Sequence, residues 1–191
     1  LTRVVLPDSI ETLGYNVFAS CDRLNEVNYP LSLKTCNVGL FENCPQMTSF
    51  IIPEGVTTMP AHLLAGCNYI KDVKLPSTLT AIPFRAFYQC AGINSIVLPN
   101  AVTAIGDYAF SGCTGLRDIV LPNGTESIGM HAFSNCISMT RIDIPATVTS
   151  IGTAAFDGCT KLKIYCEHGS YALQYAITNG IPYVKLSPAG V

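Results

Sequence analysis

A proline recurs every 23 residues in this chain of 191, and a cysteine follows each of these prolines fourteen positions later. Seven copies of the unit, in unbroken register, cover residues 6–166. A fixed period of about 20–50 residues is typical of solenoids, in which each unit completes its core only against its neighbours. The period therefore predicts a stack of similar turns. The prolines are Pro7, Pro30, Pro53, Pro76, Pro99, Pro122 and Pro145, and the cysteines are Cys21, Cys44, Cys67, Cys90, Cys113, Cys136 and Cys159.

The unit 98–120 shows which positions build the core. Near its end, Ile119 alternates with Leu121 of the next unit, so both side chains point to the same side of a short strand. Pro122 ends that strand because proline has no N–H for the ladder. One strand per turn predicts a parallel stack of strands along one face. The expected core positions of the unit are Leu98, Val102, Ile105, Ala109, Phe110, Cys113, Leu116 and Ile119.

The second half of each unit is too short and too rich in turn residues for a long helix. We expect short 3₁₀ or helical turns there, with a second narrow row of strand-like pairings. The residue before each cysteine is most often Gly or Asn, which favours a backbone near the left-handed region. An aromatic residue precedes the cysteine by three positions in all but one turn, where Leu64 replaces it. These rings are expected to form a stacked aromatic spine on the side away from the strands.

Nine cysteines would suggest disulfides on number alone, but their register argues otherwise. Seven share one repeat position, and Cys36 takes a position that is Leu, Met or Ile in the other turns. A residue that alternates with Leu and Ile behaves as a small buried hydrophobe. We therefore expect free, buried thiols, with only Cys166 outside the interior pattern. No C-x-x-C or nearby histidine spacing predicts a metal site.

The repeat ends after Leu162, where the alternation shifts by one residue. Ser170 is a good N-cap for a helix whose apolar face would hold Ala172, Leu173, Ala176 and Ile177. Asn179-Gly180 ends this helix, and residues 183–186 can add a last strand. We expect a solenoid over residues 1–166, with a partial turn at 1–5, and a C-terminal helix-strand cap over 167–191. Because residues 1–5 match the end of a unit, the chain is expected to be cut from a longer array.

Composition excludes several functions. A net charge of −2 and a pI near 5.9 provide no basic surface for nucleic acid, and no apolar run is long enough for membrane insertion. His62 and His131 are expected to be separate surface histidines, and Asn123-Gly-Thr125 is a glycosylation sequon only in a secretory eukaryote. No nucleophile or metal motif is present, so neither an enzyme nor a cofactor is predicted.

The repeat L-P-x-x-V-T-x-I-G-x-x-A-F-x-G-C-x-x-L-x-x-I-x resembles the BspA-like leucine-rich repeat, most closely at Leu98–Val120 and Ile144–Leu162. The resemblance covers nearly the whole chain, and residues 164–176 are similar to the end cap of such proteins. It implies a right-handed, β-rich leucine-rich-repeat arc. It also implies a secreted or cell-surface protein of anaerobic gut or oral bacteria or of some mucosal parasites. Several members of that family resemble adhesins that bind host matrix proteins.

The outward face of the strands is the default recognition surface of a solenoid, because it gathers one row of side chains from every turn. We call its two rows together the strand face. They are Arg3, Glu26, Ser49, Asp72, Ser95, Asp118 and Arg141, and Val5, Asn28, Ile51, Lys74, Val97, Val120 and Asp143. The candidate ligand-binding residues are Ile51, Asp72, Lys74, Val97, Asp118, Val120, Arg141 and Asp143.

Three functions remain open on the sequence. The first is an extracellular or cell-surface binding module whose strand face recognises a protein or a glycan, including host extracellular matrix. The second is a structural spacer, for which the β-branched residues merely favour strands and the charges maintain solubility. The third is the targeting part of a larger enzyme.

Overall fold

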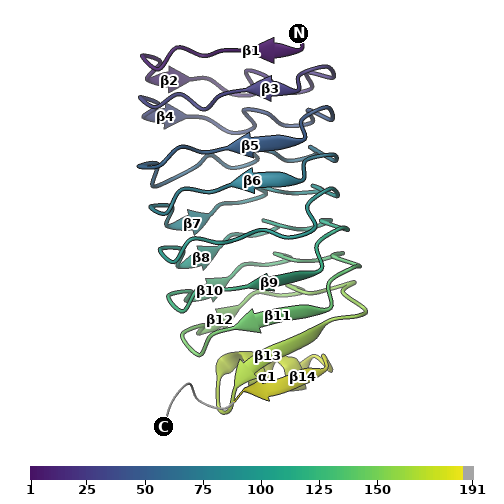
Figure 1. Cartoon of the computed structure of the whole chain (residues 1–191). Helices are drawn as coiled ribbons and strands as arrows, with labels where there is room; N and C mark the ends of the chain where they lie inside the picture. The colour runs from purple at the N-terminus through teal and green to yellow at the C-terminus, as the bar shows by residue number, and fades with distance from the viewer. Residues whose placement is uncertain (187–191) are drawn as a thin grey trace.

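The computed structural model describes residues 1–186 and shows a parallel β-solenoid closed at its C-terminal end by one helix and one strand (Figure 1). Successive turns contribute short strands to two rows. The first row contains β1 (Arg3–Val4), β3 (Glu26–Val27), β5 (Ser49–Ile51), β6 (Asp72–Lys74), β9 (Asp118–Val120), β11 (Arg141–Ile144), β13 (Lys163–Glu167) and β14 (Tyr183–Leu186). The second contains β2 (Thr12–Leu13), β4 (Thr35–Cys36), β7 (Ala81–Ile82), β8 (Ala104–Ile105), β10 (Ser127–Ile128) and β12 (Ser150–Ile151).

Within the repeats, the strands pair in the register that the period predicts. Ile51 lies opposite Lys74 and Asp118 lies opposite Arg141, so each pair of partners is 23 residues apart. Equivalent side chains of successive turns are therefore stacked in columns, which is the geometry expected for both the core and the strand face.

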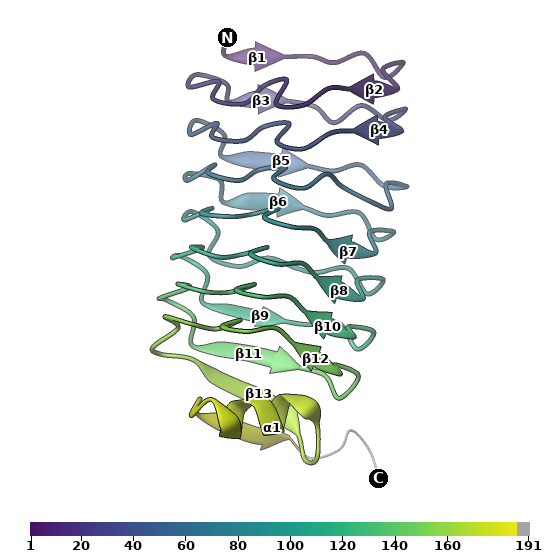
Figure 2. The ribbon, with the colours of Figure 1, turned by 180° about the vertical axis from the view of Figure 1, so that it is seen from behind.

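A third hydrogen-bonded ladder runs through the turn segments, such as residues 84–89 and 107–112, which lie toward the viewer in Figure 2. In each turn segment, a backbone N–H donates to a carbonyl oxygen of the next turn, 22 residues further along the chain. Examples are the bonds from Phe87 N to Ala109 O at 2.9 Å and from Phe110 N to Ala132 O at 2.8 Å. Unlike the two strand rows, this ladder is present between all seven repeats. Bonds from residue i to i−3 also close these segments into tight turns, as from Cys90 to Phe87. The expected short turns and second row of strand pairings are thus both present.

Two residues in each turn segment have a left-handed backbone. The prediction for the residue before each cysteine is confirmed, for example at Gln89 (φ 58°) and Asn135 (φ 57°). A second left-handed residue, four positions earlier, was not predicted. It is His62, Arg85, Tyr108, His131 or Ala154 in the later turns.

All eight expected core positions of the unit 98–120 are buried, with Leu98 the most exposed at 7%. The aromatic spine is confirmed, because the ring centroids of Phe110 lie 5.2 Å from Phe87 and 5.3 Å from Phe133 in stacked geometry. Leu64 interrupts the column, and there Phe41 packs at a tilt against Phe50 instead.

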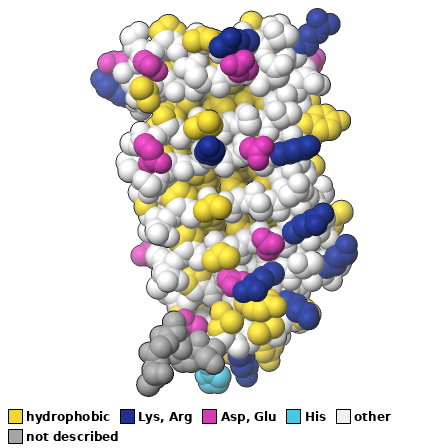
Figure 3. Space-filling model, in the orientation of Figure 1, with side chains coloured by type: hydrophobic (Ala, Val, Ile, Leu, Met, Phe, Trp, Pro, Cys, Tyr) yellow, Lys and Arg dark blue, Asp and Glu magenta, His cyan; other side chains and the backbone are white. Residues whose placement is uncertain are grey.

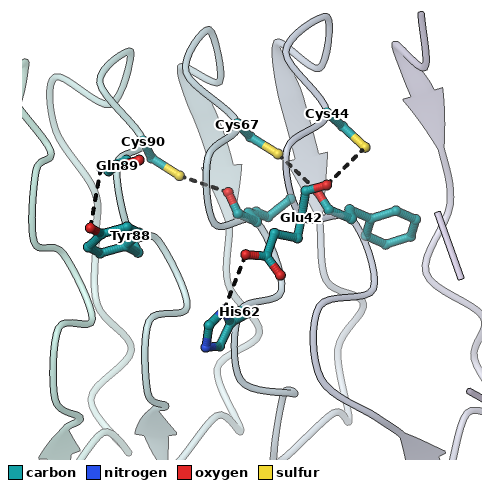
Figure 4. A network of polar contacts seen from close by, with 9 residues as sticks. Glu42, Cys44, His62, Cys67, Tyr88, Gln89 and Cys90 are labelled. Atoms are coloured by element: carbon teal, nitrogen blue, oxygen red, sulfur yellow. Dashed lines mark hydrogen bonds and ion pairs between the residues drawn. The ribbon is translucent and has the colours of Figure 1, made fainter. Parts of the chain in front are cut away.

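The repeated cysteines lie in the core or at its ends, and all nine are free thiols. The Sγ of each repeated cysteine from Cys44 to Cys159 donates to a carbonyl 26 residues earlier, as from Cys67 to Phe41 at 3.1 Å and from Cys90 to Leu64 at 3.0 Å (Figure 4). The expectation for Cys166 was wrong. It pairs in register with Ile144 of β11, and it is fully buried.

The cap has the predicted helix, α1 (Tyr171–Thr178), with Ser170 as its N-cap accepting a hydrogen bond from the Leu173 N–H. Ala172, Leu173 and Ala176 are buried as expected, but Ile177 is 53% exposed and does not belong to the packed face. Tyr175 lies edge-on to Phe156, so α1 covers the end of the aromatic spine.

Candidate recognition surface

The strand face is exposed along its length. In the row of the strand face that begins with Val5, the side chains of Ile51, Val97 and Val120 are 58%, 86% and 63% exposed. Val97 is the most exposed large hydrophobic residue among those described. Asp72, Lys74 and Asp118 are also exposed, whereas Asp143 is half-buried. Figure 3 shows apolar and charged side chains interspersed on this face, with further apolar atoms visible in furrows between the turns.

Two of the candidate residues bind each other. The Arg141 guanidinium donates to both carboxylate oxygens of Asp143, at 2.6 and 2.7 Å, and its Cζ lies 4.2 Å from the Tyr165 ring centroid. The hydrogen bonds to the Asp143 carboxylate, together with its charge, raise the pKa of the Arg141 guanidinium above its already high ordinary value. Such a fixed fork has less freedom to meet a ligand than the separate charges of Asp72 and Lys74.

The strand ladder is open at residues 95–97. This segment has the sequence pattern of its neighbours, yet it pairs with neither β6 nor β9. The first row has a second opening between β3 and β5, which do not pair with each other. At two other steps of the first row, Ile52 N donates to Lys74 O and Leu121 N to Asp143 O, each at 3.0 Å. Within residues 1–186, the equivalent bonds would run from Leu75 N to Val97 O and from Leu98 N to Val120 O, and neither is made. The edge of segment 95–98 that faces β6 has no backbone hydrogen bond. Backbone donors and acceptors are therefore left available at this point of the surface.

Two grooves flank the open segment. One, of about 710 Å³, lies between residues 71–75 and 95–100, and the other, of about 380 Å³, lies between 95–98 and 118–122. Residues 95–98 line both, so Val97 belongs to the wall that separates them. Val73 and Leu75 are only partly buried and line the larger groove, so that groove has an apolar floor.

We call the surface formed by the turn segments, such as residues 84–89, 107–112 and 130–135, the turn face. It holds aromatic contacts that were not expected from the sequence. His62 and His131 are not free surface side chains. The His62 ring packs 5.2 Å from Phe84 and lies 3.4 Å from the Glu42 carboxylate (Figure 4), and the His131 ring stacks 4.9 Å from Tyr108. The two histidines remain in different turns and do not meet.

Within residues 1–186, no group of three or more His, Cys, Asp or Glu side chains is arranged to hold a metal ion. No helix in that part of the chain has the length and apolar character needed to cross a membrane.

The fold is similar to those of solved bacterial leucine-rich repeat proteins. One from Eubacterium ventriosum is 23% identical, with a TM-score of 0.73 over 82% of this chain and 42% of its own. The T. pallidum leucine-rich repeat protein is 24% identical, with a TM-score of 0.64 over 97% and 86%. One from Bacteroides ovatus is 24% identical, with a TM-score of 0.59 over 87% and 55%.

The chain thus spans about half the length of the Bacteroides protein and less of the Eubacterium protein. No curated protein matches it. Its sequence matches the BspA type leucine-rich repeat region in six copies, over residues 1–96 and 80–167. These matches cover most of the chain, and the repeat they describe is the 23-residue unit whose core positions are buried in the structure. The chain belongs to the BspA-type leucine-rich repeat family.

Proposed function

We propose that this chain is an extracellular or cell-surface binding module that recognises a protein through its strand face. The observation that carries the proposal is the opening of the strand ladder at residues 95–97, with Val97 exposed between two grooves. Membership of a family of repeat proteins supports a binding role, because solenoids of this kind present extended recognition surfaces.

A protein suits this surface better than a glycan. An extended segment of a partner could donate to and accept from the unpaired backbone groups at 95–97, as in strand addition to a sheet edge. Its alternate side chains would then enter the grooves, and those in the larger groove would meet the apolar floor formed in part by Val73 and Leu75. Asp72 and Lys74 lie at the edge of the larger groove and offer both signs of charge for orientation.

The candidate residues divide into three groups on this proposal. Those lining the grooves are the primary contacts, namely Asp72, Lys74, Val97, Asp118 and Val120. Ile51 extends the apolar row by one turn beyond Lys74, its partner in the strand register. Arg141 and Asp143, which are joined to each other, form a charged border at the C-terminal side.

Binding to a panel of purified host matrix proteins tests the proposal. Replacing Val97 and Val120 with Ser removes two exposed apolar side chains, each of which contributes about 1.5–3 kcal/mol when fully buried in a complex. A loss of binding of at least about tenfold is expected. Val5→Ser is the matched control, because Val5 is in the same row and 68% exposed but lines neither groove.

The rival functions give other results in the same assay. A structural spacer would bind none of the matrix proteins, and the targeting part of an enzyme would bind the substrate of its neighbouring domain instead. If the folded Val97→Ser, Val120→Ser variant binds as tightly as the unsubstituted chain, the strand face is not the site.

A further inference from the structure

A hollow of about 530 Å³ lies on the turn face, apart from both strand-face grooves. Its lining comes from four successive turns, and it contains two tyrosines, three side-chain amides and two hydroxyl residues. The lining residues are Asn68, Tyr69, Tyr88, Gln89, Ala91, Ser111, Gly112, Thr114 and Asn135.

The hollow exists because the turns between its ends carry little side chain. Tyr69 is 61% exposed at one end, whereas the equivalent residues of the next two turns are Gly92 and Gly115. A Cβ at either glycine would collide with a backbone carbonyl of the preceding turn, that of Ile70 or that of Ala91. Close stacking of the turns therefore excludes side chains at these two positions. The Tyr69 ring is consequently not covered by side chains from the equivalent positions of the next two turns.

The polar groups are held ready for a ligand. Gln89, fixed in a left-handed conformation, donates from its side-chain amide to the Tyr88 hydroxyl at 3.3 Å (Figure 4). The Arg85 guanidinium, which does not line the hollow, lies 5.0 Å from the Tyr88 ring centroid and packs against it. Asn68 and Asn135 are exposed, so their amides can both donate and accept hydrogen bonds.

The chemistry of this lining selects the class of ligand. It includes no Asp, Glu, Lys, Arg or His. A nucleic acid would require cations for its phosphates, and a sulfated or carboxylated glycan would require them for its own charges. Exposed tyrosine rings provide flat apolar surfaces for the C–H faces of sugar rings, while amides and hydroxyls match sugar hydroxyl groups. The volume lies within the range of about 300–1,000 Å³ found for small-molecule sites.

We propose that this hollow binds a short, neutral oligosaccharide, with Tyr69 as the stacking platform and Asn68, Gln89 and Asn135 as the hydroxyl-binding groups. The hollow shares no lining residue with the strand-face grooves, so one chain would hold a protein and a glycan at two separate sites. It does not depend on the function proposed above.

The test applies the purified chain to an array of neutral and anionic oligosaccharides and measures the best neutral ligand by titration calorimetry. Tyr69→Ala is expected to weaken binding at least about tenfold, whereas Tyr69→Phe keeps the ring and most of the affinity. Tyr15→Ala is the matched control, because Tyr15 is 71% exposed in a distant turn. Val97→Ser should leave glycan binding unchanged, which separates this site from the strand face.

Three results would overturn the proposal. One is the absence of binding to any neutral oligosaccharide at up to about 10 mM, which is weaker than any useful site. Another is binding to anionic glycans alone. The third is a neutral glycan whose affinity is the same for Tyr69→Ala as for the unsubstituted chain, with both proteins folded by circular dichroism.

Discussion

The Sγ of Cys113 lies 3.1 Å from the carbonyl oxygen of Phe87 and donates a hydrogen bond to it. Both residues are fully buried, and the bond joins one turn to the aromatic spine of the turn before it. The same bond joins Cys136 to Phe110 and Cys159 to Phe133. The repeated cysteine is therefore a core residue that also links successive turns, which explains its place in every unit.

Stability should fall in alkaline solution because of these thiols. Burial raises the pKa of Cys67 and Cys113 from an ordinary value of 9.0 to about 12. Between these values the unfolded chain loses thiol protons that the folded chain keeps. The stabilisation is complete below pH 9 and is lost as the pH rises toward 12. Each such cysteine lowers the free energy of unfolding by about 1.4 kcal/mol per pH unit in that window.

Urea denaturation between about pH 8 and about pH 11 measures this slope. Cys113→Ala should make the slope of the free energy of unfolding against pH less steep by the contribution of one thiol. This change in slope is independent of the effect of the substitution on stability at neutral pH. A free energy of unfolding that stays constant over this range would contradict the account of the buried cysteines.

The aromatic spine makes a graded prediction at Phe110, which is stacked between two rings. Phe110→Ala leaves a cavity inside the column and should lower the free energy of unfolding by about 3–5 kcal/mol. Phe110→Leu should cost much less, about 1–2 kcal/mol, because the turn with Leu64 shows that the column accommodates leucine. Thermal or urea unfolding distinguishes the two variants. Equal losses would mean that ring stacking, rather than filled volume, determines stability here.

The left-handed positions predict a stabilising substitution. Ala154 has φ of 54°, a conformation that costs a residue with a Cβ about 1–2 kcal/mol. Ala154→Gly should raise the free energy of unfolding by about 0.5–1 kcal/mol, after the greater entropy of glycine in the unfolded chain is subtracted. The neighbouring Ala155, which is buried, provides the control, since Ala155→Gly should lower stability by about 1 kcal/mol. A loss of stability in Ala154→Gly would show that this position is not strained.

The sequence could predict the core because the same constraint acts on every turn. Phe110 and Cys113 recur at a fixed spacing, and only interior packing demands the same side chain at each step. The residues of the strand face could be predicted equally well, because the alternation of Ile119 with Leu121 determines which residues point outward. The periodicity of the sequence thus identified the features that all turns share, namely the core positions and the outward-facing residues of the strands.

Features that belong to single turns could not be predicted in this way. Residues 95–97 have the same alternation of outward and buried residues as β6 and β9. The sequence Ser-Ile-Val therefore does not predict that the ladder is open at this segment. The left-handed residues at Arg85 and Tyr108 were missed because neither residue type favours that conformation. Cys166 was misplaced because the alternation shifts at Leu162, and the register of β13 with β11 is a tertiary property.

Hydrogen–deuterium exchange at residues 95–98 tests the central claim most directly. In the free protein we expect these amides to exchange at least about a hundredfold faster than those of β11, whose ladder is closed on both sides. A matrix protein bound at the strand face should slow exchange at 95–98 and leave the turn face unchanged. Slow exchange at 95–98 in the free protein, equal to that of β11, would contradict the open ladder and the recognition site built on it.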